Sequence, residues 1–406
     1  MKLLHAIFLG RPLGTLAEIP AGIVFEYAPE FLAEEIDISP FNLPRRSGVL
    51  ARGGSPQRRL PGVFEDSLPD AWGQRVLAAW FRARGTPAHA ITPLMQLAYL
   101  GERTLGALSY EPALVVDAGE PTLGEIYSAA ATLESSGEVD LATLAQVGSP
   151  AGGARPKAVL CLSANEEPRA FAGPPEKAPP GFVASIVKFD TGEQELGALE
   201  EAYALMARAA GLNVPPSRLV STPDRITGKM RRHFAVARFD RDAAGARVHY
   251  HSLAGLLETG GGDLDYRLLL RACRRLTRDE REVWKAYRQA VFNVLAHNRD
   301  DHGKNIGFVL REGEWALAPA FDLTPLAPAQ LPERGMAVLG ERRAAGETHL
   351  LALAQAESLD AARARQIIAE VRAALGDWPK FAASAGVSDW RSAEWGRELK
   401  AAAALR

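Results

Sequence analysis

A short polar segment near residue 300 carries the residue types that phosphate chemistry needs. Asp300 is followed five residues later by Asn305, and a second acid, Asp322, comes after a short apolar stretch. A carboxylate can take the proton of an attacking hydroxyl group. An amide oxygen and a second carboxylate are hard oxygen ligands that suit Mg²⁺. These residues predict phosphoryl transfer, with Asp300 as the base and Asn305 and Asp322 as the metal ligands.

The flanks of this segment decide its interpretation, because Asp-x4-Asn by itself also occurs in ordinary polar loops. The spacing is that of a protein-kinase catalytic loop, and kinases place a further metal-binding Asp downstream. A helix is predicted just before the polar cluster by the apolar residues Val291, Phe292, Val294 and Leu295. Residues 306–309 and 315–317 predict two short strands that turn at Glu312-Gly313. The cluster is therefore positioned between ordered elements, as a site would be.

A second candidate region lies upstream, where Gly152 and Gly153 precede an apolar strand that begins near Lys157. Backbone N–H groups of a glycine-bearing loop can cradle phosphate. Lys188 ends another predicted strand, 183–189, and offers a point charge to phosphate groups. Each feature alone also fits a hairpin turn or an edge lysine. Their order along the chain, ahead of the Asp300 segment, favours the small lobe of a kinase.

The composition describes an ordinary globular chain. It has 406 residues, 47% hydrophobic and 24% charged, with a net charge of −2, so nothing overall indicates a nucleic-acid binder. The two cysteines, Cys161 and Cys273, have no disulfide or metal spacing, which predicts a cytoplasmic protein. We expect no membrane span, since no apolar run reaches about 18 residues. The first residues predict a strand and a turn rather than a signal peptide.

The predicted elements define an α+β chain with a two-lobe, protein-kinase-like fold. Helices are predicted over 193–211, 279–296, 359–375 and 389–405, and Thr277 with Glu280 predicts a capping box for the second of them. The expected organisation is an N-terminal α/β subdomain (1–120), a β-rich small lobe (121–245) and a helical large lobe (246–406).

Several longer motifs extend over nearly the whole chain: LPDAWGQRVL at 68–77, GGARPKA at 152–158, SIVKF at 185–189, AGLNVPPSRL at 210–219, VARFDR at 236–241, FNVLAHNRDDHGKN at 292–305 and LAPAFDLTP at 317–325. With these motifs the sequence resembles the HipA family of serine/threonine kinases. Members of that family are the toxin components of bacterial HipBA toxin–antitoxin pairs.

The resemblance implies ATP and Mg²⁺ as cofactors and a role for each matching residue. Asp300 matches the catalytic base, and Asn305 and Asp322 match the magnesium ligands. Nucleotide contacts are implied for Gly152, Gly153, Ala154, Arg155, Lys157, Lys188, Arg238, Phe239, His302 and Lys304. Within this set, residues 152–157 match the phosphate-binding loop, and Arg238 with Phe239 matches the hinge between the lobes.

The family also implies partners. Its members phosphorylate an aminoacyl-tRNA synthetase, typically glutamyl-tRNA synthetase, and thereby stop growth. Their antitoxin is a small helix-turn-helix, HipB-like protein, so DNA would be engaged only through that partner, and no membrane is involved. Two alternatives stay open from the residues alone: a small-molecule or lipid kinase that uses the same loop, and a nucleotide-binding corepressor module with little turnover.

The sequence departs from the family pattern at two positions. The well-known members carry an autophosphorylated serine seven residues before the lysine that matches Lys157, whereas this chain has Pro150 there and Ser149 one residue earlier. Proline has no hydroxyl group, so we expect no autophosphorylation at position 150. Asp301 stands where many members carry glycine, and its role is left open by the sequence.

Overall fold

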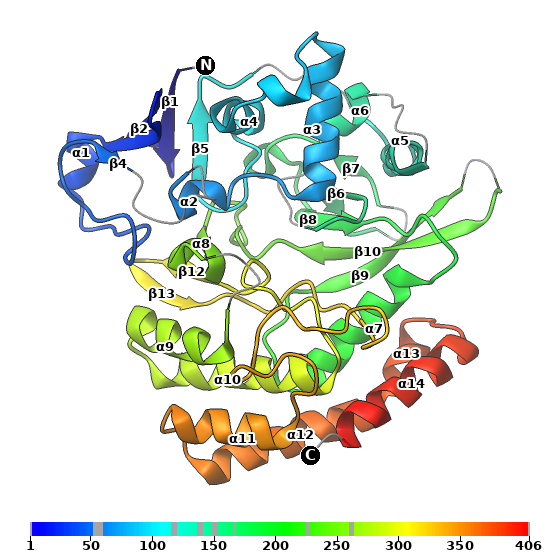
Figure 1. Cartoon of the computed structure of the whole chain (residues 1–406). Helices are drawn as coiled ribbons and strands as arrows, with labels where there is room; N and C mark the ends of the chain where they lie inside the picture. The colour runs from blue at the N-terminus through cyan, green and yellow to red at the C-terminus, as the bar shows by residue number, and fades with distance from the viewer. Residues whose placement is uncertain are drawn as a thin grey trace. The chain divides into compact units, whose positions relative to one another are not determined.

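The computed structural model describes residues 2–51, 60–114, 120–135, 141–147, 153–165, 168–224, 227–259 and 264–404 (Figure 1). The chain divides into two compact units. The N-terminal unit comprises Met1–Glu193, Val220–His251 and Gly255–Glu258, and the C-terminal unit comprises Gln194–Leu219, Ser252–Ala254 and Thr259–Arg406. In the part that is described, no helix combines the length and the apolar character needed to cross a bilayer.

The first sheet of the N-terminal unit has the strand order β4-β3-β2-β1-β5. Its strands are β1 (Leu3–Phe8), β2 (Arg11–Ile19), β3 (Gly22–Tyr27), β4 (Leu50–Ala51) and β5 (Leu108–Glu111). Buried and exposed residues alternate along β1 and β3, so one face is apolar. That face packs on the short helices α1 (Pro29–Leu32), α2 (Gly62–Glu65) and α4 (Pro93–Leu100) in one hydrophobic core.

The second sheet of this unit has the strand order β7-β6-β8-β10-β9. Its strands are β6 (Lys157–Ser163), β7 (Ala170–Phe171), β8 (Phe182–Lys188), β9 (Ser217–Pro223) and β10 (Met230–Ala237), and β9 enters the unit at Val220. One face shares a core with α3 (Ala71–Ala83), α5 (Leu123–Ser135) and α6 (Leu141–Gln146). Two 3₁₀ turns complete the unit, Ala88–Ala90 and Pro175–Lys177. The helices cover one face of the sheet and leave the other as the candidate ligand face.

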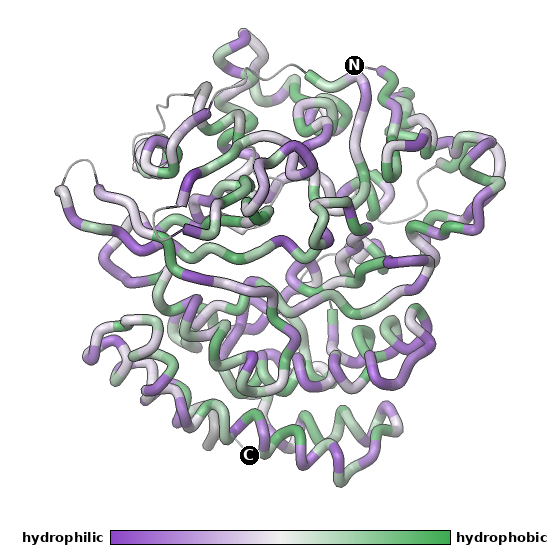
Figure 2. The backbone as a smooth tube through the Cα atoms, turned by 180° about the vertical axis from the view of Figure 1, so that it is seen from behind, coloured by the Kyte–Doolittle hydropathy of each residue, from purple (hydrophilic) through white to green (hydrophobic). Residues whose placement is uncertain are grey.

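The C-terminal unit is mainly helical and consists of α7 (Leu196–Ala209), α9 (Tyr266–Thr277), α10 (Glu280–Leu295), α11 (Glu347–Ala356), α12 (Ala361–Gly376), α13 (Trp378–Ser384) and α14 (Asp389–Ala404). Helix α10 is buried along most of its length and packs on α9 and α12. Helix α7 packs on α12 and α13. The segment Gln194–Leu219 therefore belongs to this unit, although the predicted boundaries placed it within residues 121–245. Hydrophilic and hydrophobic positions alternate along the helices near the C-terminus, as amphipathic packing requires (Figure 2).

The hairpin of β12 (Gly307–Arg311) and β13 (Glu314–Leu317) sets the spacing of the candidate catalytic residues. Glu312 and Gly313 form its two-residue turn and both have positive φ angles, 51° and 83°. This is the conformation of a type I′ turn, which matches the twist of the two strands. The predicted turn at Glu312-Gly313 is thereby confirmed. Asn305 lies just before the hairpin and Asp322 follows it. The chain passes between the two units at β11 (His249–Ser252) and α8 (Leu253–Leu257).

Candidate active site

Two adjacent acids on the loop between α10 and β12 have opposite environments. The side chain of Asp300 is 45% exposed, whereas that of Asp301 is fully buried at 0%. A residue that takes a proton from an incoming substrate must be reachable from outside the protein. Of the pair, Asp300 alone meets that condition.

Asp301 anchors the loop from the inside. Its carboxylate accepts hydrogen bonds from Tyr266 Oη at 2.6 Å, from Arg334 Nε at 3.1 Å and from the backbone N–H of Met336 at 3.3 Å. Burial, followed by the charge of Asp301, raises the pKa of Tyr266 well above its usual value, so the tyrosine stays protonated as a donor. The acid whose role the sequence left open is therefore a positioning residue for the loop.

Asn298 joins the Asp300 loop to the segment that carries Asp322. Its Oδ1 atom accepts from the backbone N–H of Thr324 at 3.3 Å, and its Nδ2 atom donates to Asn293 Oδ1 at 3.0 Å. The backbone N–H of Leu326 also donates to the carbonyl of His297 at 3.1 Å. The predicted base and one predicted metal ligand are thus held by a common set of hydrogen bonds. Sequence reasoning missed Asn298, since nothing local distinguishes it from other loop amides.

Asn305 is buried, and its Nδ2 atom donates to the carbonyl of Asp300 at 2.9 Å. Because the amide nitrogen donates a hydrogen bond within the loop, the amide oxygen is the atom that is left to coordinate a metal ion. Asp322 has a left-handed backbone, with φ at 55°. In the described ranges no three His, Cys, Asp or Glu side chains gather as a metal site. One amide and one carboxylate fit Mg²⁺, which keeps phosphate oxygens and water as its other ligands.

His302 and Lys304 lie on the same loop. The imidazole Nε2 atom of His302 is 3.7 Å from Asp300 Oδ1, and its Nδ1 atom accepts from the backbone N–H of Lys304 at 3.3 Å. Lys304 is exposed and His302 is half-buried. The loop therefore presents one acid, one imidazole and one ammonium group within a span of five residues.

In the N-terminal unit, Lys157 and Lys188 are directly opposite each other in the antiparallel register of β6 and β8. Opposed residues of such a pair share one face of the sheet. Both lysines are buried, with 3% and 7% exposure, and Lys188 Nζ is 6.0 Å from the centre of the Phe234 ring on β10. This end of the sheet face is therefore cationic, which suits phosphate groups.

The same face continues as an apolar row. Val159 is opposite Ile186, and Ile186 is opposite Val236, so the three side chains cross β6, β8 and β10 side by side. All three are half-buried, whereas the next residues along the strands, such as Val187, are buried in the core on the other face. A flat apolar row beside two lysines suits a planar base next to its phosphates. Sequence reasoning missed this row, although the two-residue period from Lys157 and Lys188 points to it.

The loop before β6 is tied to the start of α3. The N–H of Gly153 donates to Asp70 Oδ2 at 3.2 Å, the N–H of Trp72 donates to the carbonyl of Gly153 at 3.2 Å, and Trp72 Nε1 donates to the carbonyl of Lys157 at 2.9 Å. Gly153 has a φ of 95°, which a residue with a side chain rarely adopts.

The structure describes only some of the remaining residues of the predicted phosphate loop. Ala154 is exposed and Arg155 is half-buried. Gly152, Ser149 and Pro150 lie outside the described residues, so the expectation for position 150 stays a prediction.

The predicted hinge residues lie at the end of β10. The Arg238 guanidinium is turned into the protein, where Nε and Nη2 donate to Asp240 Oδ1 and Oδ2 at 2.9 and 2.7 Å. The Phe239 ring packs edge-on against Tyr250, with 5.6 Å between the ring centres. The side chain of Arg238 is therefore held by an internal ion pair, and only the backbone at 238–239 is left for a hinge contact with a nucleotide.

The predicted residues thus form two sets, each within its own unit. The N-terminal unit holds Gly153, Ala154, Arg155, Lys157, Lys188, Arg238 and Phe239. The C-terminal unit holds Asp300, His302, Lys304, Asn305 and Asp322.

A β-rich unit with a lysine-bearing sheet face and a helical unit with an Asp–Asn loop define a protein of the kinase-like α+β class. Comparison with family profiles then gives two matches: the HipA N-terminal domain over residues 4–111 and the HipA-like C-terminal domain over residues 149–378. The chain belongs to the HipA family. The family and the fold class expected from the sequence are both confirmed.

A solved structure shares the fold of the chain. HipA of Shewanella oneidensis MR-1, determined in a complex with HipB and its operator DNA, is similar with a TM-score of 0.70 and 17% identity, covering 98% of this chain and 96% of that chain. The proinflammatory kinase CtkA of Helicobacter pylori has a TM-score of 0.39 and 16% identity, covering 55% of this chain and 87% of that chain. The comparison with curated proteins gave no match.

Proposed function

We propose that this protein is an ATP- and Mg²⁺-dependent serine/threonine protein kinase that acts as the toxin of a toxin–antitoxin pair. The observation that carries the proposal is the difference in solvent exposure between the two adjacent acids of the candidate catalytic loop. Asp300 is reachable, while its neighbour Asp301 is buried and fixes the loop. A loop held from inside with one acid directed outward suits a base that must orient a hydroxyl group.

The other residues supply binding and orientation. Lys157 and Lys188 would meet the phosphates of ATP, with the base against Val159, Ile186 and Val236. The oxygens of Asn305 and Asp322 would hold Mg²⁺, which neutralises phosphate charge when it is bound. Asp300 would accept the proton of the attacking serine or threonine.

The substrate and the partner are inferred from the family. HipA of Shewanella oneidensis forms a complex with HipB and operator DNA, and we infer a HipB-like helix-turn-helix antitoxin for this chain. The inferred substrate is a cytoplasmic aminoacyl-tRNA synthetase, whose phosphorylation would stop translation and growth and favour persistence. DNA would be reached only through the antitoxin.

Transfer of labelled γ-phosphate from ATP, with Mg²⁺, tests this proposal on purified aminoacyl-tRNA synthetases and on a cytosolic extract. Label on a serine or threonine of a synthetase is the expected result. Label only on a small molecule or lipid would favour the other kinase class. Nucleotide binding without transfer to any component would favour the corepressor module.

We expect Asp322→Ala to weaken the Mg²⁺ dependence of nucleotide binding, because a hard carboxylate ligand is lost. Nucleotide affinity should be titrated at several Mg²⁺ concentrations. Glu314→Ala, at an exposed acid of the neighbouring hairpin, is the matched control. The same Mg²⁺ requirement in Asp322→Ala and in the wild type would remove this residue from the metal site.

Lys188→Met should lower ATP affinity by about 10- to 100-fold, since hydrogen bonds to a charged group contribute about 1.5–3 kcal/mol. The register of β6 and β8 predicts a similar loss for Lys157→Met. Lys177→Met, at an exposed lysine of the same unit, should leave the affinity unchanged. Direct calorimetric titration measures all three, and wild-type affinity in Lys188→Met would make that lysine a purely structural residue.

A further inference from the structure

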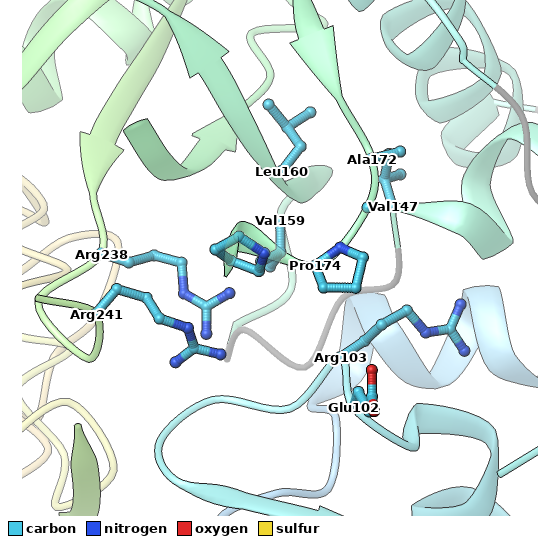
Figure 3. Close-up of a pocket in the computed structure, with 11 residues that line it drawn as sticks. Glu102, Arg103, Val147, Val159, Leu160, Ala172, Pro174, Arg238 and Arg241 are labelled. Atoms are coloured by element: carbon cyan, nitrogen blue, oxygen red, sulfur yellow. The ribbon is translucent and has the colours of Figure 1, made fainter. Parts of the chain in front are cut away.

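A small cavity lies in the N-terminal unit, between the second sheet and the loop that precedes β5 (Figure 3). Its volume is about 30 Å³. Arg103, Arg238 and Arg241 line it together with Val159 and Pro174. Figure 3 shows the guanidinium groups of Arg238 and Arg241 side by side, while that of Arg103 points the other way. The cavity therefore has a cationic wall.

A single carboxylate serves both of these arginines. Asp240 Oδ2 is 2.7 Å from Arg238 Nη2 and 2.9 Å from Arg241 Nη1. The side chains of the two arginines are only 3% and 2% exposed, and that of Asp240 is 6% exposed. Two buried positive charges thus share one negative charge.

The neighbouring groups balance the excess positive charge only in part. Arg247 adds a further cation and donates to the carbonyl of Leu108 at 3.3 Å, while Arg103 donates to the carbonyl of Ala145 at 2.6 Å. Carbonyl groups satisfy donors, but they carry no net charge. Two acids act on the cluster from outside: Glu176 on Arg241 and Arg247, and Glu102 on Arg247. Both side chains are exposed, so solvent screens their charge. In the described part of the chain, the buried Nε atom of Arg241 has no hydrogen-bond partner.

The cluster keeps its positive charge at neutral pH. Burial, followed by the charge of Arg238, lowers the pKa of Arg241 to about 10, so the guanidinium is still protonated. A buried cation without a full counter-charge costs several kcal/mol. An anion in the cavity would offset that cost.

We propose that this cavity binds a small oxyanion with the chemistry of inorganic phosphate. Asp240 holds both arginines in place and uses Nε and Nη2 of Arg238. The buried Nε–H of Arg241 has no partner among the described residues and is a charged donor suited to an oxyanion oxygen. A cavity of about 30 Å³ has room for a small ion and not for a nucleoside, since one water needs about 10–15 Å³ on the same scale. The cavity borders the proposed nucleotide site, because Val159 also belongs to the apolar row on the sheet face and Arg238 to the predicted hinge.

Thermal unfolding of the full chain in phosphate, against chloride at equal ionic strength and without ATP or Mg²⁺, tests the proposal. The titration should use a Lys157→Met, Lys188→Met background, so that phosphate cannot act through the candidate ATP site. The melting temperature should rise with phosphate and saturate. Arg241→Gln should remove this rise, and AMP should not reproduce it.

Glu102→Gln provides a test that does not disturb the buried cluster. Removing this exposed charge should lower the half-saturating phosphate concentration several-fold, whereas Glu26→Gln, at an exposed acid away from the cavity, should leave it unchanged. An equal rise in chloride and phosphate would overturn the site. A phosphate-dependent rise in melting temperature that persists in Arg241→Gln would also overturn the site. If Arg241→Gln does not fold, an unchanged half-saturating phosphate concentration in Glu102→Gln would overturn it.

Discussion

Replacement of Asp300 by asparagine is expected to lower kcat for phosphoryl transfer by about 10²- to 10⁴-fold, the range for loss of a general base. The change keeps the size of the side chain and removes its ability to take a proton. ATP binding should persist, because Asp300 is not among the expected metal ligands. Stability should also persist, because the side chain is 45% exposed. Labelled-ATP transfer and denaturant unfolding measure the two properties separately.

A variant that retained more than about half of the wild-type turnover would show that Asp300 is not the base. A variant that lost activity because it unfolds would show a lower denaturant concentration at the midpoint of unfolding. The adjacent acid supplies the matched comparison, since it has the same chemistry and a different environment.

Asp301→Asn is expected to destabilise the protein by about 3–5 kcal/mol, the cost of leaving one partner of a buried ion pair without the other. Arg334, with 2% side-chain exposure, would lose its carboxylate, and Tyr266 would lose an anionic acceptor. The free energy of unfolding from urea denaturation measures the effect. The loss of unfolding free energy in Asp301→Asn should be several times larger than the loss in Asp300→Asn.

The double variant Asp301→Leu, Arg334→Met separates the charge from the shape of the pair. Apolar residues of similar volume often replace a buried ion pair with little loss of stability. The double variant should therefore recover most of the stability lost in Asp301→Asn. If Asp301→Asn unfolds at the wild-type urea concentration, the buried pair does not anchor the loop.

The local parts of the fold could be predicted from sequence, because their signals lie within a few residues. The strand predicted over 183–189 is β8 (Phe182–Lys188), and the turn at Glu312-Gly313 is in place. The helix predicted over 279–296 is α10, but its predicted capping box at Thr277 was wrong. Asp279 is the N-cap and accepts from the N–H of Arg281, because two capping residues compete within three positions.

The contacts that hold the candidate site are long-range, so sequence spacing could not show them. Arg334 is 33 residues from Asp301 and lies in a region, 325–348, that has no periodic pattern. Asp240 accepts from the backbone N–H of Gly106, 134 residues away. Neither pair has a local signal that singles it out. Only the face shared by Lys157 and Lys188 follows from a strand period that the sequence displays.

The hydrogen bonds around Asn298 have a consequence for how the protein opens. The amides of Thr324 and Leu326 are protected from exchange only while the Asp300 loop is in place, since they donate to Asn298 and His297. Hydrogen exchange should therefore report one opening free energy for both segments, as for a single cooperative unit. A regulator that drew Asp300 away from Asp322 would have to break this unit. An inactive state is therefore expected to keep the base and the metal ligand together.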